Sequence, residues 1–485
     1  MNQQTRKTLV ETKPIGRRLL ELATEKPDAP ALTSMSASGS WQTLTRADLC
    51  HRVRATATAM DAAMDPSHGF ALIDLPNGQS FFIAVLATWW SGRTPLIIPP
   101  NSTPEELNVL FAATGGKQPA PYVTEEILSH GAAATDVLRQ PSPEREEGWY
   151  LPTGGSTGLP GLVPVYGQPA SLIAGQQLLM SAMGWRASAV QLVLGPLFHA
   201  APFTSSFSGI VGGNHIVAPP RFSRPDLEAA LEIAHPTWLQ LTPHHMNLIG
   251  ADDGFMSTLS ESLDGMMHTA APCPEDVKRH WINRLGGHRV FEMYGSTQMI
   301  GAAICSGTDW LRRPGTVGRP FMTQVRILDE RGRRLPPDTV GEVTMRSTGT
   351  RRMAASENHV RRHAGGYCGV GDLGYLDRDG YLFLTDRLDD VIIVGGANVS
   401  AREVEAVLLT HPSIREAIVV SRTHDLLGQT PYAVIACVGK PPSFAEVQKH
   451  CAQRLAPYKV PFAMEVVPEL DRSRAEKIQR YKYTE

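Results

Sequence analysis

The chain has 485 residues, of which 42% are hydrophobic, so it is long enough for two or more domains with a substantial buried core. Its 46 basic and 48 acidic residues nearly cancel. This balance provides no cationic surface of the kind that binds nucleic acid or an anionic membrane, so we expect small molecules as partners.

Cysteine usage and apolar runs indicate the compartment. The six cysteines are scattered, without a Cys-x-x-Cys pair or a short disulfide framework. The first residues, MNQQTRKTLVETKP, contain no apolar stretch of the kind found in signal peptides, and the longest apolar run, FFIAVLATWW, is too short to cross a bilayer. We therefore expect reduced thiols and a cytoplasmic location without membrane attachment.

Helical and strand-like stretches alternate in the first half of the chain. PIGRRLLELATEKP has helical periodicity, while FALIDLP and TPLIIPP are short apolar runs typical of buried strands. LEAALEIAHP places Leu227, Ala230 and Leu231 on one helical face, and TWLQLTP follows as a strand expected to end at Pro243. The alternation predicts a layered α/β core that continues past residue 240.

The pattern changes after residue 315. VRILDERGRRL and GEVTMRS are β segments separated by turn residues, which predicts a mostly antiparallel subdomain. In the last hundred residues, DVIIVGGANVS predicts a hairpin, and AREVEAVLLTHP and SFAEVQKHCAQRL predict helices. Cys451 falls on the apolar stripe of the second helix, so we expect it in the core.

The run TGGSTG, from Thr153 to Gly158, has the composition of an anion-binding loop. Its glycines let the backbone approach a phosphate closely, and Thr153, Ser156 and Thr157 add hydroxyl donors. It is not a Walker loop, because the string Gly-x-x-x-x-Gly-Lys-Ser/Thr does not occur in the chain. A Ser/Gly-rich surface turn would explain the run if it stood alone.

Four further motifs follow the loop in order. They are MYGSTQ (293–298), GDLGYLDRDG (371–380), DRLDDVIIVGGANVSAREVE (386–405) and APYKVP (456–461). Together with the loop, these motifs resemble the adenylate-forming superfamily of acyl-CoA synthetases, adenylation domains and luciferases, and in particular its acyl-CoA ligase branch. The resemblance extends from about residue 70 to RAEKIQR near the C-terminus.

The resemblance implies both a fold and a reaction. The fold is α/β, with an N-terminal nucleotide- and acyl-binding domain at 1–388, made of layered α/β subdomains plus a β subdomain. A small mobile α+β lid follows at 389–485, with its hinge at Asp389. Members of the superfamily activate a carboxylic acid with ATP and magnesium to acyl-AMP, after which a thiol, often that of coenzyme A, displaces AMP.

The motifs also imply residue roles at the nucleotide. Tyr294 would stack on adenine opposite the run Thr269–Pro272, Thr297 would donate to the α-phosphate, and Asp372 would accept from the ribose hydroxyls beside Arg387. The full implied nucleotide-binding set is Thr153, Gly155, Ser156, Thr157, Gly158, Ala270, Ala271, Pro272, Tyr294, Gly295, Asp372 and Arg387.

Further positions match the acyl, thiol and catalytic sites of the superfamily. Lys477 aligns with the lysine that contacts the substrate carboxylate and α-phosphate, although Ala475-Glu476 replaces the usual Ser-Gly before it. Gly395 and Gly396 fall where the pantetheine arm of coenzyme A passes the backbone, and a hairpin turn would also explain them.

His199 in GPLFHA matches a position beside the carboxylate site. Phe203 and Trp238 are candidate walls of the acyl pocket. Each of these three residues could equally be a satisfied core residue.

The sequence departs from the superfamily in two motifs, the phosphate loop with its lysine and the motif with its magnesium-binding glutamate. The phosphate loop normally reads Ser-Gly-(Ser/Thr)-Thr-Gly-x-Pro-Lys-Gly, whereas Gly154, Gly161 and Leu162 replace its first serine, its lysine and its last glycine. Gln298 replaces the glutamate that normally helps to hold magnesium. Because adenylation expels pyrophosphate with the help of cations and a metal, both substitutions are expected to weaken it.

The substitutions leave several functions open. One is a ligase specialised for thioester formation from preformed acyl-adenylate, which would suit a natural-product pathway containing a sister adenylating enzyme. Another is a full ATP-dependent acyl-CoA ligase, which Lys477 favours. A stand-alone adenylation enzyme that loads a carrier protein and a catalytically silent nucleotide-binding regulator are the remaining alternatives. The sequence does not identify the carboxylic acid.

Overall fold

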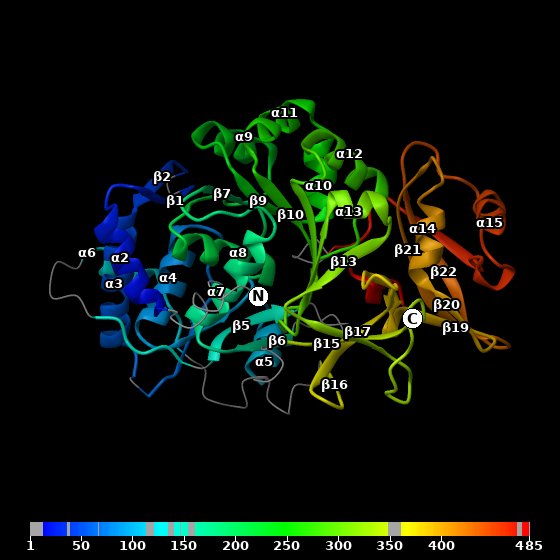
Figure 1. The fold of residues 1–485 in the computed structure, drawn as a ribbon, viewed down its shortest axis with the longest axis horizontal. Helices are drawn as coiled ribbons and strands as arrows, with labels where there is room; N and C mark the ends of the chain where they lie inside the picture. Colours follow the sequence, from blue (N-terminus) through cyan, green and yellow to red (C-terminus); the bar gives the residue numbers. More distant parts are fainter. Residues whose placement is uncertain are drawn as a thin grey trace. The chain divides into compact units, whose positions relative to one another are not determined.

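The computed structural model describes residues 13–35, 39–65, 67–112, 121–133, 140–145, 147–153, 161–347, 360–472 and 478–484 (Figure 1). These residues form two compact units, the first ending at Pro314 and the second beginning at Gly315. The α/β fold class expected from the sequence is confirmed. No helix in the described ranges is both long and apolar enough to cross a membrane.

The larger sheet of the first unit has the order β12-β11-β10-β9-β7-β8-β1-β2. Its strands are parallel from β11 to β1, and the edge strands β12 and β2 are antiparallel to their neighbours. The strands are β1 Pro30–Met35, β2 Trp41–Thr45, β7 Val190–Val193, β8 His215–Ala218, β9 Trp238–Leu241, β10 Gly265–His268, β11 Val290–Gly295 and β12 Ala302–Ser306.

A smaller sheet in the same unit has the order β3-β4-β5-β6. Its strands are β3 Phe70–Ile73, β4 Thr94–Ile97, β5 Glu147–Thr153 and β6 Gly161–Tyr166. The expected strands in FALIDLP and TPLIIPP are therefore confirmed as β3 and β4, which pair in parallel.

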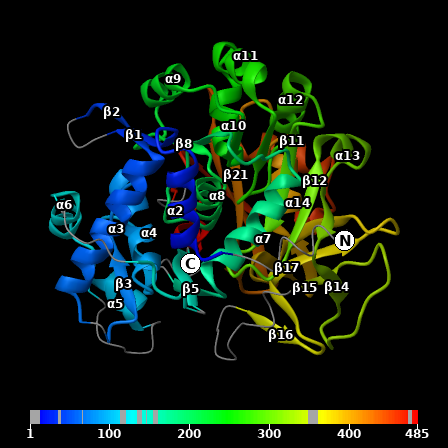
Figure 2. The ribbon, with the colours of Figure 1, turned by 60° about the vertical axis from the view of Figure 1, so that its left-hand side comes forward.

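Helices cover the two sheets of the first unit. They are α2 Ile15–Glu25, α3 Arg46–Ala63, α4 Gln79–Trp90, α5 Pro104–Ala112, α6 Glu125–Ala133, α7 Pro169–Ser181, α8 Ala200–Val211, α9 Arg224–Ile233, α10 Pro243–Gly250, α11 Asp253–Ser262, α12 Glu275–Leu285 and α13 Gly307–Arg312. Figure 2 shows α2, α3 and α4 lying beside one another. From Phe81 to Trp90, α4 is buried throughout, because its apolar side chains pack on all sides.

One expected boundary is wrong by two residues. The predicted strand in TWLQLTP ends at Leu241, and Pro243 begins the next helix, α10. The side chain of Thr242 accepts from the backbone N–H of His245, and proline at the first helical position has a backbone angle that already suits a helix. The helix cap at Thr242 therefore ends the strand before the apolar pattern predicts.

A single carboxylate holds the beginnings of two helices in the first unit. Glu144 accepts hydrogen bonds from the backbone N–H of Ile15 at 2.6 Å and of Ala170 at 3.1 Å. These groups lie in the first turns of α2 and α7, where N–H groups lack partners within the helix. Burial raises the pKa of the Glu144 carboxyl, although the two N–H donors lower it.

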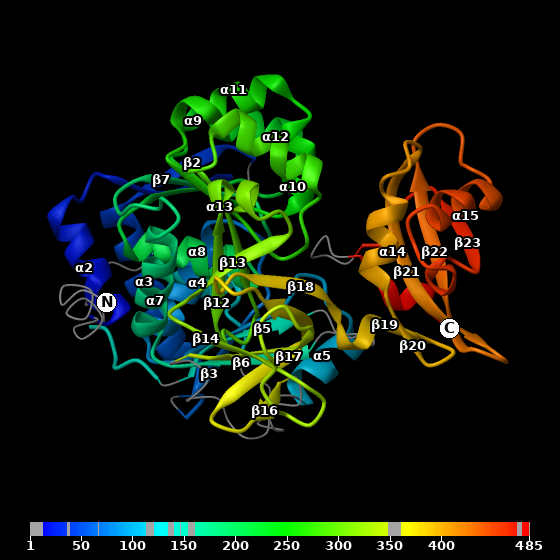
Figure 3. The same cartoon turned by 45° about the vertical axis from the view of Figure 1, so that its right-hand side comes forward.

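The second unit contains two sheets formed by described residues. The first has the order β14-β15-β17-β18-β13 with β16 paired to β17, and it is antiparallel as expected. The second has the order β20-β19-β22-β21 with β23 parallel to β22 (Figure 3).

The strands of the first sheet are β13 Thr316–Phe321, β14 Gln324–Leu328, β15 Gly341–Arg346, β16 Arg361–His363, β17 Tyr367–Leu376 and β18 Leu382–Arg387. Those of the second are β19 Val391–Val394, β20 Ala397–Ser400, β21 Ile414–His424, β22 Gly428–Cys437 and β23 Ala463–Val467. Helices α14 Ala401–Leu408 and α15 Phe444–Ala452 complete this region, with the short 3-10 helices η1 Leu388–Asp390, η2 Pro457–Lys459 and η3 Arg480–Tyr483.

The C-terminal sheet has its own apolar core. Cys451 on α15 is completely buried in it, which confirms that this thiol is a core residue. The predicted hinge residue Asp389 lies in η1, between the two sheets of the second unit. The domain boundary at 388/389 stays a prediction.

Candidate active site

The first unit brings two implied nucleotide-binding segments side by side. Strands β10 and β11 are parallel neighbours, with His268 opposite Glu292. Thr269, directly after β10, donates from Oγ1 to the backbone oxygen of Met293 on β11 at 2.7 Å. The run Ala270, Ala271 and Pro272 therefore lies next to the strand end that carries Tyr294 and Gly295, at the carboxyl edge of the parallel sheet, where ligands of α/β proteins usually bind.

The backbone of this edge is unusual at two residues. Ala270 has a φ of 79° and Met299 a φ of 52°, although residues other than glycine rarely adopt left-handed conformations. Ala270 belongs to the expected adenine wall, and Met299 closes the turn of the β11–β12 hairpin, with its N–H bound to the oxygen of Ser296. Such local strain persists where surrounding structure imposes it, often at ligand sites.

Thr297 and Gln298 lie in that hairpin turn, and both are half-buried. The hydroxyl of Ser296, just before them, is buried and has no hydrogen-bond partner among the residues that the structure describes. The sequence had not singled out Ser296. Its position beside Thr297 makes it a second hydroxyl of the same turn.

A buried ion pair supports β11 from helix α12. Lys278 Nζ lies 2.5 Å from Glu292 Oε2, with side-chain exposures of 2% and 11%, and it also lies 4.8 Å from the ring centroid of Trp310. His268 is fully buried beside the pair, and burial lowers its pKa well below the ordinary value, with Lys278 lowering it further. The imidazole of His268 is therefore neutral, and the negative charge of Glu292 is balanced by Lys278.

The glycine-rich loop connects two paired strand ends. Thr153 is the last residue of β5 and lies opposite Gly161, the first residue of β6, so the glycine that replaces the family lysine begins a strand. Gly155, Ser156, Thr157 and Gly158, together with the side chain of Thr153, lie outside the described residues. Lys477 does so as well, and its role stays a prediction.

The residues expected at the acyl group divide into two kinds. His199 is half-buried, precedes the first turn of α8, and has its ring 4.3 Å from that of Phe198. Phe203 is 0% exposed and packs against Trp149 and Phe207 at 5.4 and 4.7 Å between ring centroids.

Trp238 is likewise 0% exposed, and its indole N–H donates to the oxygen of Met183. Phe203 and Trp238 act as core residues in this structure, which is the alternative left open for them by the sequence. His199 is only half-buried, and its place at the acyl group stays a prediction.

In the second unit, Asp372 and Arg387 are brought together by strand register. They are direct partners in the β17–β18 pair, and Arg387 Nε lies 3.9 Å from Asp372 Oδ1. Arg387 also donates to the oxygen of Val370 at 3.1 Å. A carboxylate next to a half-exposed guanidinium can accept from sugar hydroxyls while the cation faces a phosphate.

Gly395 and Gly396 form the turn between β19 and β20. Their φ values are 56° and 87°, as two-residue hairpin turns require, and a side chain at Gly396 would meet open space. Both explanations offered by the sequence therefore remain, because a turn made of glycines also leaves a backbone free for close passage.

Near the predicted hinge, Arg480 joins three elements. Its guanidinium lies 2.6 Å from Glu405 on α14, donates to the oxygen of Val419 on β21 at 3.0 Å, and lies 3.9 Å from Asp390 in η1.

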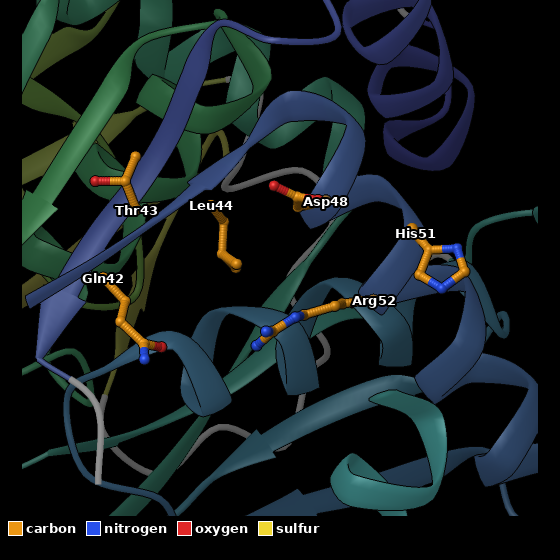
Figure 4. A pocket seen from close by; sticks show the side chains of 6 residues that line it. All are labelled: Gln42, Thr43, Leu44, Asp48, His51 and Arg52. Atoms are coloured by element: carbon orange, nitrogen blue, oxygen red, sulfur yellow. The ribbon is translucent and has the colours of Figure 1, made fainter. Parts of the chain in front are cut away.

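A concave region lies elsewhere in the first unit, away from the candidate residues of that unit. A surface pocket of about 360 Å³ is lined by Gln42, Thr43 and Leu44 of β2 and by Asp48, His51 and Arg52 of α3 (Figure 4). Asp48 already accepts from the backbone and hydroxyl of Thr45 as a helix cap. None of the residues implied by the motifs lines this pocket, so we do not assign it to the active site.

Comparisons with known proteins agree with the motifs. A family model described as AMP-binding enzyme matches residues 118–353, and a model of the AMP-binding enzyme C-terminal domain matches residues 403–477. The 2-succinylbenzoate–CoA ligase of Bacillus mycoides (strain KBAB4) is 30% identical over 425 residues, which cover 84% of this chain and 86% of the relative. The chain belongs to the AMP-binding enzyme family.

Other relatives agree with this assignment. The 2-succinylbenzoate–CoA ligase of Bacillus cytotoxicus is 27% identical over 421 residues, with coverage of 84% and 86%. Among solved structures, o-succinylbenzoate CoA synthetase from Bacillus subtilis with its acyl-adenylate intermediate shares the fold with a TM-score of 0.81 at 23% identity, covering 97% of this chain and 98% of that one.

ATP-bound MatB from Rhodopseudomonas palustris gives a TM-score of 0.82 at 21% identity, covering 97% and 98%. The resemblance to adenylate-forming enzymes is confirmed, and within the AMP-binding enzymes this chain groups with the acyl-CoA ligases.

Proposed function

We propose that this AMP-binding enzyme is an acyl-CoA ligase specialised for the second half-reaction, in which an acyl-adenylate donates its acyl group to coenzyme A. The thiol sulfur attacks the acyl carbonyl carbon and forms the C–S bond. The bond from that carbon to the phosphate oxygen then breaks, AMP leaves with the electron pair, and the thiol proton passes to solvent. No oxidant or metal is consumed in this step.

The observation that carries the proposal is the pair of substitutions, Gly161 for a lysine and Gln298 for a glutamate. Adenylation must stabilise departing pyrophosphate, and its metal relies on anionic oxygen ligands. Gln298 offers a carbonyl oxygen without charge. The carboxylate of Glu292, on the strand that leads into this turn, is buried and paired with Lys278, so its charge is already neutralised. Among the described residues, no group of three or more His, Cys, Asp or Glu side chains could hold a metal ion.

Thioester formation makes smaller demands on charge. It needs a bound nucleotide, an open path for the thiol and AMP as leaving group. The side chains expected to bind the nucleoside are retained, with Tyr294 beside the Ala270–Pro272 run and Asp372 beside Arg387. The proposal implies that a separate adenylating enzyme supplies the acyl-adenylate.

A full ATP-dependent ligase is the second candidate. Lys477 is present at the position of the adenylation lysine, and the relatives carry the name of complete CoA ligases. One relative with this fold has been solved with ATP and a magnesium ion. Under this alternative, both substitutions would be tolerated without loss of the first half-reaction.

Two separate assays distinguish the candidates. One supplies an acid, ATP and magnesium and measures pyrophosphate release, and the other supplies the acyl-adenylate with coenzyme A and measures thioester. Because the relatives are named for 2-succinylbenzoate, this acid and its adenylate are the first probes, followed by a panel of aromatic and aliphatic acids. We expect thioester from the adenylate and little pyrophosphate. Pyrophosphate release as fast as thioester formation would establish the full ligase.

The same assays address the remaining alternatives. A pantetheinylated carrier protein offered in competition with coenzyme A identifies the thiol acceptor. AMP binding without thioester from any adenylate in the panel would indicate a silent nucleotide-binding regulator.

Restoring the lost charges provides a second test. In the double variant Gly161→Lys, Gln298→Glu, we expect pyrophosphate release to rise by at least about tenfold, since a residue that stabilises transition-state charge commonly contributes that much or more. Thioester formation from the adenylate should change little. The control is Gln298→Asn, which keeps an amide and should restore nothing.

A further inference from the structure

Asn77 connects two loops that come from different sheets of the first unit. Its amide N–H donates to the backbone oxygen of Gly195 at 3.0 Å, and its amide oxygen accepts from the backbone N–H of Leu197 at 2.9 Å. Asn77 belongs to the loop between β3 and α4, whereas Gly195 and Leu197 belong to the loop between β7 and α8. The contact therefore spans about 120 residues of sequence.

The loop that Asn77 holds ends at His199. The N–H of His199 donates to the oxygen of Pro196 at 3.1 Å, so the segment from Gly195 to His199 forms a tight turn before α8. On its other side the turn lies against that helix, because a Cβ atom at Gly195 would come within 2.6 Å of Pro202 Cγ. The turn is fixed between Asn77 and α8, with little room to shift.

Both loops follow parallel strands at their carboxyl ends, the edge at which α/β proteins bind their ligands. We propose that Asn77 is a positioning residue of this enzyme: it holds the Gly195–His199 turn so that His199 faces the reacting acyl group. This inference rests on the proposed function, because it takes His199 as the residue beside the acyl group.

The amide group suits this task for a chemical reason. A side-chain amide offers a donor and an acceptor in one plane, so a single asparagine can bind the C=O and the N–H of one turn at the same time. Aspartate keeps the acceptor for Leu197 but, when ionised, offers no donor to Gly195. Alanine loses both contacts. Asn77→Asp thus removes one of the two hydrogen bonds, and Asn77→Ala removes both.

A second asparagine provides a matched control. Asn214 is buried, and its Oδ1 accepts from the backbone N–H of Ala189 at 3.3 Å, just before β7 begins. Asn214 therefore supports the beginning of β7, whereas Asn77 holds the turn that follows the end of β7. A purely structural contribution should appear in both Asn77→Ala and Asn214→Ala, whereas an effect on catalysis should appear in the first alone.

Hydrogen exchange of the full-length protein tests the contact itself. We expect the Leu197 amide to exchange at least about fivefold faster in Asn77→Ala, the change that loss of one ordinary hydrogen bond produces. It should stay protected in Asn77→Asp and in Asn214→Ala. Unchanged protection in Asn77→Ala would overturn the proposal, whatever the activity of the protein.

Thioester formation from an acyl-adenylate tests the role of the contact. In Asn77→Ala and Asn77→Asp, kcat should fall by roughly tenfold with a smaller change in KM, since a misplaced His199 affects the transition state more than ground-state binding. Asn214→Ala should keep wild-type kcat. An equal fall in kcat in Asn77→Ala and Asn214→Ala, or no fall in either, would overturn the positioning role.

The two readouts also separate this inference from the function on which it rests. If the wild-type protein formed no thioester with any adenylate, the proposed function would fail, and with it the positioning role of Asn77 in that reaction. The exchange experiment would still decide whether the contact between the two loops exists in solution.

Discussion

The two units hold their candidate residues in different ways. In the first unit, the strand ends that carry Ala270 and Tyr294 are fixed by the buried Lys278–Glu292 pair and by the bond from Thr269 to Met293. In the second unit, Asp372 and Arg387 are joined by a longer contact of 3.9 Å, with Arg387 46% exposed. The first unit therefore fixes its candidate residues by buried contacts, whereas the pair in the second unit is partly exposed and should open at a lower cost in free energy.

Breaking the buried pair should give the largest effect. Lys278→Met leaves the Glu292 carboxylate buried without its partner, which should destabilise the first unit by about 3 to 5 kcal/mol. Replacing both residues in Lys278→Met, Glu292→Leu should recover much of the loss. The measurement is urea unfolding followed by circular dichroism.

Helix α12 also supplies the control for this prediction. Arg279 pairs with Glu275 at 2.6 Å, but their side chains are 42% and 60% exposed. Arg279→Met should cost less than about 1 kcal/mol, because solvent screens an exposed pair. If Lys278→Met proved no more costly than Arg279→Met, the fixed strand ends of the first unit would need another explanation.

Removal of Asp372, the carboxylate predicted to bind the ribose, should have the next largest effect, on nucleotide binding rather than on stability. Losing a charge-assisted hydrogen bond costs about 1.5 to 3 kcal/mol, so Asp372→Ala should weaken AMP binding by at least tenfold in calorimetry. Asp377→Ala is the control, because its side chain accepts from the N–H groups of Asp379 and Tyr381 within the β17–β18 turn. Equal AMP affinity in wild type and Asp372→Ala would remove the ribose assignment.

The glycine turn of the second unit allows the two explanations for Gly396 to be separated. Gly396→Ala should cost about 1 kcal/mol of stability, and Gly396→Asn less, since asparagine tolerates the left-handed conformation. If pantetheine passes this backbone, both variants should slow thioester formation while AMP binding stays unchanged.

Gly380 is the matching control for that experiment. It has a φ of 81°, open space around it and a place in another hairpin turn of the same unit. Gly380→Asn should leave thioester formation unchanged. Full activity of Gly396→Asn would show that only the turn requires the glycine.

Thiol reactivity should show the smallest difference between the units. Burial raises the pKa of Cys305 in the first unit to about 12. It also raises the pKa of Cys437 in the second unit, but that side chain is only half-buried. At pH 8, native Cys437 should react with a thiol reagent well before Cys305, and in urea both should react at once.

The same shift predicts a pH dependence of stability. The Cys305 thiol ionises near its ordinary pKa of 9.0 when unfolded but only near 12 when folded. The contribution of the buried, neutral thiol to the free energy of unfolding is therefore complete below pH 9. It should be lost as the pH rises from 9 toward 12, because the thiol then ionises in the unfolded protein but not in the folded one. Cys305→Ala should show a smaller alkaline loss in urea unfolding than wild type.

Short-range patterns predicted the local structure well. The apolar runs identified β3, β4 and β9, and the turn in VRILDERGRRL is present, with the N–H of Gly332 bound to the oxygen of Asp329. The motifs also led to Asp372 and Arg387, which strand register makes neighbours. Periodicity and motif order carry this information because they depend on residues close in sequence.

Contacts across long stretches of sequence were not predictable. Lys278 and Glu292 are 14 residues apart on a helix and a strand, and Asn77 meets Leu197 across 120 residues. A buried lysine and a loop asparagine look like surface residues in a sequence. Phe203 and Trp238 illustrate the same limit, since only packing shows that both are enclosed by other side chains.

The carboxylate of Glu144 affects when the start of helix α2 can be capped during synthesis of the chain. Its partner Ile15 is synthesised 129 residues earlier. At about 5 to 20 residues per second, helix α2 waits roughly 6 to 26 s on the ribosome before the carboxylate that caps it has been synthesised. Ala170 arrives later still. Helix α2 can therefore pack against α3 and α4 well before its first turn is capped, and the cap should act late, by fixing the start of a helix that is already docked.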